Sequence, residues 1–341
     1  MAGRSKWTRR KGGVGDEGGP LQPLLVDYFT RDGSTLMMRL LSSSPQVAVG
    51  GGYPFEHKYF AYIFRWARLI DKTEWPRRIW NGSHLGTLTQ EDNMPMMGPP
   101  PWMPRDLMGP DRTGTDFSEA AFRLVWEEFS ERAAADTRRR TKKRGAAVRY
   151  YAEKHLSTWK IDLEGMPPLK VIALLRDPRD TYVSIVSFSK RRREEGKPGA
   201  MGKRPGESVE DWLTRHLDRQ RDRLRWIHDA IENETMPVVR YEDLVLDLEG
   251  EARKLESILG IDLDPSVVME DSEMRSTHVS AESPEGSIGR WREEMKPHLL
   301  QRFNEELGDE MKALGFEVPE PESPRARAAA ARAARAAAQS T

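Results

Sequence analysis

The chain has 341 residues, which is enough for one large α/β domain or two smaller ones. Its 54 Lys and Arg residues balance its 54 Asp and Glu residues, so no global basic field favours nucleic acid or an anionic membrane. The absence of Cys excludes disulfides, thiolate metal sites and Cys nucleophiles.

The two ends of the chain are predicted to lie outside the folded domain. Residues 1–22 are rich in Gly and charge, which indicates a disordered segment, and residues 319–341 form a low-complexity Ala/Arg tail. The N-terminal segment lacks the apolar core of a signal peptide, and no apolar run approaches the roughly 20 residues that span a bilayer. We expect a cytoplasmic protein with no membrane span and no nucleic-acid partner, folded over residues 23–318.

Between these ends, short apolar runs alternate with helical patterns. In chain order, the predicted elements are a strand at 24–29, a helix at 36–41, a strand at 170–175, a helix at 181–193, a strand at 237–240 and a helix at 249–259. The apolar runs lack a two-residue alternation and each precedes a helix, which is typical of a parallel sheet covered on both faces. The sequence therefore predicts a single doubly wound α/β domain with helices on both faces.

Residues 72–116 break this rhythm, because they are rich in Pro and Met and show little periodicity. Such a long irregular stretch inside a domain is typical of a functional lid or an insertion. As a lid it would shape a ligand pocket, and as a surface excursion it would form a contact, for example in a homodimer.

The segment Thr-Arg-Asp-Gly-Ser-Thr at 30–35 lies between the first predicted strand and helix. Gly33 permits a tight turn, after which the first helical amides and the hydroxyls of Ser34 and Thr35 can hold a phosphate. Arg31 adds a positive charge, which makes this a P-loop-like nucleotide site. An ordinary helix cap is the alternative, and the Walker A spacing occurs nowhere in the chain.

A second motif, Arg-Asp-Pro-Arg-Asp at 176–180, directly follows the clearest predicted strand. Ligands of open α/β sheets bind at this carboxyl end of the strands. Arg176 and Ser184, eight residues further on, can bind one phosphate between them. Local salt bridges of Asp177 and Asp180 are the alternative use of the motif.

Two further segments complete a pattern that resembles the sulfotransferases that use 3′-phosphoadenosine 5′-phosphosulfate (PAPS). They are Arg-Tyr-Glu-Asp-Leu at 240–244 and Gly-Ser-Ile-Gly-Arg-Trp at 286–291. The resemblance covers nearly the whole predicted domain, in the family's order. It implies transfer of a sulfuryl group from PAPS to an acceptor hydroxyl or amine, with no metal ion.

The resemblance also implies which residues bind the donor. The first motif would bind the 5′-phosphosulfate, the second the 3′-phosphate, and Tyr241 would reach the adenine. The donor-binding residues are thus expected to be Arg31, Asp32, Gly33, Ser34, Thr35, Arg176, Ser184, Tyr241, Ser287 and Arg290.

Two departures separate this chain from the cytosolic steroid and phenol enzymes of the family. Those enzymes carry a Trp after the first motif, where this chain has Leu36, and Arg-Lys-Gly in the closing loop, where it has Pro-Glu-Gly at 284–286. The resemblance is therefore closer to the bacterial and carbohydrate-type branches. Because the closing loop differs, the roles of Ser287 and Arg290 stay open.

The expected catalytic residues are Arg31, Glu56, Lys154 and His155. Arg31 would neutralise charge on the leaving group, and Lys154 resembles the family Lys that contacts the sulfuryl group after an intermediate strand. Glu56, expected at the start of a helix, is favoured as the general base. His155 lies one residue after Lys154 instead of two, which on a strand turns it to the other face. His57 remains a further alternative.

The acceptor is not readable from the sequence, and carbohydrates, lipids and small molecules all remain open. A nucleotide or small-molecule kinase and a degenerate anion-binding protein are the alternative functions. The basic runs at 138–144 and 191–193 would either steer an anion or form solvated faces.

Overall fold

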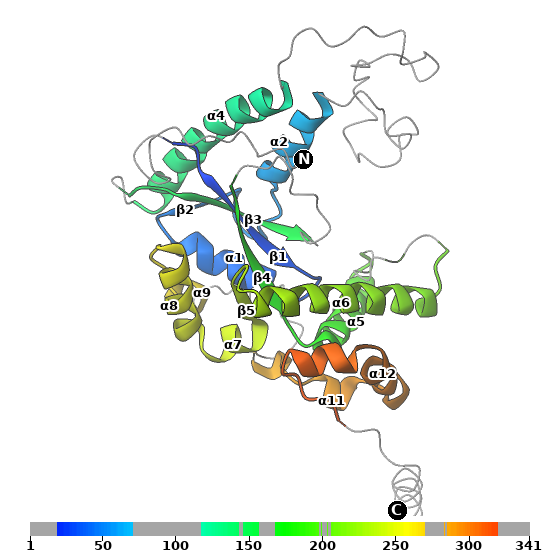
Figure 1. The fold of residues 1–341 in the computed structure, drawn as a ribbon. Helices are drawn as coiled ribbons and strands as arrows, with labels where there is room; N and C mark the ends of the chain where they lie inside the picture. The colour runs from blue at the N-terminus through cyan, green and yellow to red at the C-terminus, as the bar shows by residue number, and fades with distance from the viewer. Residues whose placement is uncertain are drawn as a thin grey trace, which may run out of the picture. The chain divides into compact units, whose positions relative to one another are not determined.

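The computed structural model describes residues 19–70, 117–142, 146–156, 168–197, 199, 203, 206–269, 283 and 285–319 (Figure 1). The lid or insertion predicted at 72–116 lies outside the described residues. So do residues 1–18 of the predicted N-terminal segment and 320–341 of the predicted tail.

One five-stranded sheet has the strand order β2-β3-β1-β4-β5. Its strands are β1 (Gln22–Tyr28), β2 (Val47–Val49), β3 (Tyr150–Leu156), β4 (Lys170–Leu175) and β5 (Val238–Arg240). Strand β2 pairs in parallel with β3, and β4 pairs in parallel with β5. The predicted parallel α/β sheet is thus confirmed, and the three strands expected from the sequence are β1, β4 and β5.

The described residues also form a series of helices, labelled in Figure 1. Their bounds are α1 (Ser34–Ser43), α2 (Tyr59–Ile70), α4 (Phe117–Arg140), α5 (Pro178–Glu194), α6 (Val209–Glu232), α7 (Tyr241–Leu246), α8 (Leu248–Leu259), α9 (Ser266–Met269), the 3₁₀ turn η4 (Glu285–Ser287), α11 (Trp291–Glu294) and α12 (Pro297–Ala313). No helix in the described ranges is long and apolar enough to cross a membrane.

Helix α5 begins three residues before its predicted start at Thr181, because the residues at 177 and 178 favour the start of a helix. Asp177 caps it by accepting a hydrogen bond from the Arg179 amide at 2.9 Å. Pro178 occupies the first helical position, where its missing N–H costs nothing. The capped start places Arg176 at the junction of β4 and α5.

The described chain divides into two compact units. The first contains β2, α2, α4 and β3 up to Lys154, and its core is a cluster of aromatic rings contributed by α2, α4 and β3. Its buried members are Phe60, Phe64, Phe122, Trp126 and Tyr151. Three other aromatic residues of α2, Tyr59, Tyr62 and Trp66, remain exposed.

The second unit contains most of α1 and the elements from β4 onward. Within it, α12 lies alongside α6 (Figure 1). Leu213, Leu217 and Leu224 of α6 share one apolar cluster with Phe303 and Leu307 of α12.

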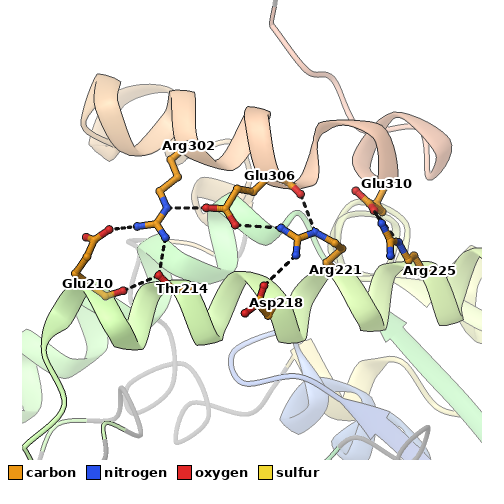
Figure 2. Close-up of polar contacts among 8 residues, drawn as sticks. All are labelled: Glu210, Thr214, Asp218, Arg221, Arg225, Arg302, Glu306 and Glu310. Carbon is orange, nitrogen blue, oxygen red and sulfur yellow. Dashed lines mark hydrogen bonds and ion pairs between the residues drawn. The ribbon is translucent and has the colours of Figure 1, made fainter.

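Charged side chains join the same two helices along one side of this contact (Figure 2). Arg302 binds both Glu210 and Glu306, and Arg221 binds Glu306 at 3.0 Å. These pairs are partly exposed, so each contributes little to stability, and the apolar cluster carries the packing.

His216 is a buried polar residue within this unit. Its ring stacks on Trp212, with centroids 4.9 Å apart, and meets Phe29 edge-on at 5.3 Å. Its Nε2 has no hydrogen-bond partner among the described residues. Burial, followed by the nearby charges of Arg219 and Arg215, lowers the pKa of His216 from 6.5 to about 3. The imidazole is therefore held neutral in the folded state.

We predict that His216→Phe changes how stability depends on pH. Since the folded-state pKa lies below the unfolded value, the stability present above pH 6.5 is lost as the pH falls towards 3. The wild type should lose about 1.4 kcal/mol per pH unit relative to His216→Phe below pH ~6. Urea unfolding at pH 4.5 to 7.5 measures this difference.

The control is His228→Phe, which places the same ring at a half-buried position of α6. A pH-independent difference between His216→Phe and wild type would contradict the prediction.

Candidate functional site

The loop between β1 and α1 folds as a double turn. Arg31 and Gly33 both have left-handed backbones, with φ of 70° and 95°. The Phe29 amide donates a hydrogen bond to the Asp32 carboxylate, which closes the turn. A Cβ at Gly33 would collide with the ring of Tyr241, so this position requires Gly on two grounds. The loop delivers the chain into the first turn of α1 at Ser34.

Arg31 brings the first predicted phosphate motif to the second. Its Nε donates to the Ser184 hydroxyl at 3.2 Å, and its guanidinium lies 4.4 Å from the centre of the Phe188 ring. Ser184 lies on α5, 153 residues away in the chain. A non-Gly residue with positive φ is strained, and such strain concentrates at functional sites. The loop after β1 and helix α5 are therefore in contact through Arg31 and Ser184.

Arg176 lies at the carboxyl end of β4 and reaches two loops. Its Nη1 donates to the Arg31 carbonyl at 2.6 Å, and its Nη2 donates to the Ser287 carbonyl at 2.8 Å. The guanidinium also lies 4.1 Å from the centre of the Tyr241 ring. Its buried Nε has no hydrogen-bond partner among the described residues. Two hydrogen bonds thus hold the Arg176 guanidinium in place, while its Nε is unsatisfied among the described residues.

Tyr241 and the segment after η4 complete this cluster. The Tyr241 hydroxyl and the Ser287 hydroxyl are 2.7 Å apart, within hydrogen-bond distance. Asp180 holds the following residues by accepting hydrogen bonds from the Gly289 amide at 2.6 Å and the Trp291 amide at 3.0 Å. Burial raises the pKa of Asp180. Asp180 therefore fixes the segment that carries Ser287.

Arg290 turns towards α5 from the same segment. Its Nη2 donates to the Ser187 hydroxyl at 3.2 Å, and its Nε binds Glu294 at 2.6 Å. Arg290 thus contacts Ser187, the residue before Phe188 on α5. Ser287, by contrast, contacts Tyr241 and Arg176. These placements do not test the roles that the resemblance implies for the two residues.

A buried ion cluster beneath this site was not anticipated from the sequence. Arg223 of α6, with 2% of its side chain exposed, binds Asp27 of β1 at 3.0 Å and approaches Asp32 at 3.7 Å. It also donates to the Leu174 carbonyl near the end of β4. Burial raises the pKa of Asp32 to about 7 against the lowering effect of Arg223. One guanidinium thus connects the loop after β1 to the end of β4.

In the first unit, Lys154 and Glu56 form an ion pair. Lys154 lies within β3 and is only 2% exposed, whereas the sequence analysis expected it after a strand. Its Nζ also donates to the Pro54 carbonyl at 2.8 Å. Glu56 lies in the loop before α2 and not at the start of a helix, and its side chain is 56% exposed.

The two histidines proposed as alternative bases lie differently. His155 follows Lys154 on β3, where alternation along a strand points the two side chains to opposite faces, and it is half-buried. His57 is exposed, and its ring stacks on Tyr59 with centroids 5.8 Å apart.

Glu153 supports the loop that carries Glu56. It is fully buried on β3 and accepts hydrogen bonds from the Phe60 amide at 2.9 Å and the Ala61 amide at 3.0 Å. Burial raises the pKa of Glu153 to about 7. A strand residue thus caps the first turn of α2, a role that has no local sequence signal because its partners lie more than 90 residues away.

Among the described residues, no group of three or more His, Asp or Glu side chains is arranged to hold a metal ion.

Comparison with known proteins identifies a family. The model of the sulfotransferase family matches residues 29–265, which is well over half of the chain. No curated protein matches the sequence.

Several solved structures are similar at low sequence identity. Retinol dehydratase in complex with androsterone and the inactive cofactor PAP is 13% identical, with a TM-score of 0.39, over 89% of this chain and 84% of that one. The sulfotransferase domain from the curacin biosynthetic pathway is 15% identical, with a TM-score of 0.45, over 88% and 99%. A sulfotransferase from Mycobacterium avium is 14% identical, with a TM-score of 0.41, over 88% and 78%.

We predict that Arg223→Met destabilises the protein strongly. The substitution leaves Asp27 and Asp32 buried without their cation, which typically costs about 3–5 kcal/mol. Urea unfolding measures the loss. The double variant Asp27→Leu/Arg223→Met removes both sides of the ion pair and should recover part of it.

Arg221→Ala is the matched control, because Arg221 lies on the same helix in partly exposed ion pairs (Figure 2). It should cost no more than about 1 kcal/mol. Equal losses for the two single variants would show that burial of Arg223 does not decide its contribution.

Proposed function

The chain belongs to the sulfotransferase family, and we propose that it transfers a sulfuryl group from PAPS to a hydroxyl or amine of a carbohydrate, lipid or other small-molecule acceptor. PAPS carries an anionic group at each end of its ribose, the 3′-phosphate and the 5′-phosphosulfate. The donor site must therefore supply two separate anion-binding centres.

The observation that carries the proposal is the buried Nε of Arg176, which has no acceptor within the described part of the chain. A buried donor without an acceptor costs about 1–3 kcal/mol, which a ligand oxygen at this point would offset. Arg176 and the Ser184 hydroxyl are the residues that we assign to the 3′-phosphate. A charge-assisted hydrogen bond from a guanidinium is strong and directional, so this residue should dominate nucleotide affinity.

The loop at 31–35 is assigned to the 5′-phosphosulfate. It leads into the N-terminus of the ten-residue helix α1, whose first amides and helix dipole favour an anion. The hydroxyls of Ser34 and Thr35 lie in that first turn. Tyr241 is assigned to the adenine.

In the transfer step, the acceptor oxygen or nitrogen forms a bond to sulfur as the bond from sulfur to the bridging oxygen of the 5′-phosphosulfate breaks. We propose an in-line displacement, in which catalysis comes mainly from positioning and from stabilising charge. Arg31 would stabilise the negative charge that develops on the leaving 5′-phosphate. Lys154 is assigned to the oxygens of the sulfuryl group.

The proton of the acceptor goes to a general base, which we assign to Glu56. Its ion pair with the buried ammonium of Lys154 supports this choice, because it orients an exposed carboxylate beside a proposed sulfuryl-binding cation. His155 and His57 are the alternatives.

We predict that Arg176→Ala weakens binding of the product 3′-phosphoadenosine 5′-phosphate (PAP) roughly 10- to 100-fold, because a buried phosphate loses its guanidinium partner. Calorimetry without metal should also show much weaker binding of adenosine 5′-phosphate and ATP to the wild type.

Arg221→Ala is the control, because Arg221 pairs with Asp218 and Glu306 at the contact between α6 and α12, and it should bind PAP as the wild type does. Equal affinity for PAP and adenosine 5′-phosphate would remove the 3′-phosphate site. Metal-dependent binding of ATP in preference to PAP would favour a kinase.

We predict that Glu56→Gln lowers kcat about 10²- to 10⁴-fold without changing PAP affinity, because only the proton acceptor is lost. Turnover of radiolabelled PAPS would be followed with an acceptor found by screening sugars, lipids and phenols. His155→Gln and His57→Gln are the matched variants. If one of them abolishes turnover while Glu56→Gln does not, the base is that histidine.

A further inference from the structure

The chain reverses direction directly after α12. Gly315 has a left-handed backbone, with φ of 76°, and its amide donates a hydrogen bond to the Lys312 carbonyl at 2.9 Å. The Phe316 amide donates to the Met311 carbonyl, also at 2.9 Å. This pair of bonds is a Schellman motif, which ends a helix in a defined turn. We refer to residues 314–317 as the C-terminal turn.

Two arginines of the second unit bind the backbone of this turn. The Nη2 of Arg179, on α5, donates to the Glu317 carbonyl at 2.6 Å. The Nη1 of Arg240, the last residue of β5, donates to the Leu314 carbonyl at 2.6 Å. The Cζ of Arg240 also lies 4.3 Å from the centre of the Phe316 ring. The C-terminal turn is thus joined to the start of α5 and to the end of β5.

A third connection passes through the buried ring of Trp291. The Cζ atoms of Arg179 and Arg292 lie 3.7 Å and 4.5 Å from the centre of this ring. The Nη2 of Arg292 also binds the Glu317 carboxylate at 2.6 Å. The C-terminal turn is therefore joined to α11 as well.

Each of these three arginines lies within three residues of a candidate donor-binding residue. The pairs are Arg179 with Arg176, Arg240 with Tyr241, and Arg292 with Arg290. Asp177 connects the first two pairs, because its carboxylate binds the Arg179 guanidinium at 2.7 Å and its amide donates to Glu242 at 2.9 Å. The C-terminal turn therefore contacts three separate segments that carry candidate donor-binding residues.

The relative position of these segments matters for binding. Arg176 and Tyr241 come from different elements, and one nucleotide must contact both of them in the proposed function. Hydrogen bonds and stacking contacts are sensitive to displacements of about 1 Å, so the site needs a support that fixes one segment against the other. The family model matches residues 29–265, so the C-terminal turn lies beyond the matched region.

We propose that the C-terminal turn is a positioning element of the donor site, which acts through Arg179 and Arg240 to hold Arg176 and Tyr241 in the arrangement that binds the nucleotide. This inference rests on the proposed function. If the turn instead served only the stability of the fold, its loss would leave the affinity of the folded protein unchanged.

The test uses Phe316→Ala and Arg240→Gln, which weaken the same contact and leave Arg176 and Tyr241 in the chain. Calorimetry measures PAP affinity, and urea unfolding measures the stability of the same samples. We expect each variant to bind PAP about 5- to 10-fold more weakly than the wild type. Since both changes remove one contact, the double variant should lose little more than either single variant.

Two matched variants separate positioning from stability. Leu307→Ala opens the apolar contact between α12 and α6, so it should lower the urea midpoint and leave PAP affinity within about twofold of wild type. Arg240→Lys keeps a cation and a donor at the end of β5, and it should retain most of the affinity that Arg240→Gln loses. Arg240→Gln carries the test if Phe316→Ala does not fold.

Wild-type PAP affinity in both Phe316→Ala and Arg240→Gln would overturn the proposal. So would an equally large loss in Leu307→Ala, because affinity would then follow stability alone. If the wild type does not bind PAP, the proposed function fails, and hydrogen exchange without ligand still tests the positioning. The Asp177 amide, which donates to Glu242, should exchange faster in Phe316→Ala than in Leu307→Ala, and equal rates would contradict the inference.

Discussion

The candidate donor site depends on a guanidinium buried between three elements. Arg223 extends from α6 to the carboxylate of Asp27 on β1, to the carbonyl of Leu174 on β4 and towards Asp32 in the loop after β1. A charge this deeply buried is tolerated only when it is paired and hydrogen-bonded, so the positions of its partners are tightly constrained. The loop that carries Arg31 and the strand end that precedes Arg176 are therefore held by one side chain.

Arg176, which follows the end of β4, is the residue of the candidate site that this packing positions. Two of its donors bind backbone carbonyls, at Arg31 and Ser287, so that the guanidinium is held before any ligand arrives. Its Nε is buried and has no partner among the described residues. A preorganised donor of this kind loses little conformational entropy on binding, which favours affinity. The unsatisfied atom is tolerated because the surrounding contacts already fix the side chain.

The charge of the molecule is organised locally. Equal numbers of acidic and basic residues leave no net field, yet Arg31, Arg191 and Arg192 gather around Phe188, and Lys154 is buried beside Glu56. Coulomb interactions are stronger where water is excluded, so a partly buried charge interacts more strongly with its neighbours than an exposed charge does. The ion pairs between α6 and α12 (Figure 2) are partly exposed, so each of them contributes little to stability.

The family motifs, the α/β class and three of the five strands could be predicted from the amino-acid sequence, because they follow from local patterns. Two examples are Gly33, which precedes two hydroxyl residues, and Arg176, which directly follows an apolar run. Only the tertiary structure shows that Arg223 is buried and Arg221 partly exposed, or that Arg191 lies by Phe188 and Arg193 does not. The sequence cannot separate them, because the two residues of each pair are both Arg and lie on the same helix. It also placed Lys154 inside β3, where the sequence analysis expected a residue beyond the strand. Whether a charged residue is buried and paired depends on which elements, distant in the sequence, pack around it. A local sequence pattern does not contain this information.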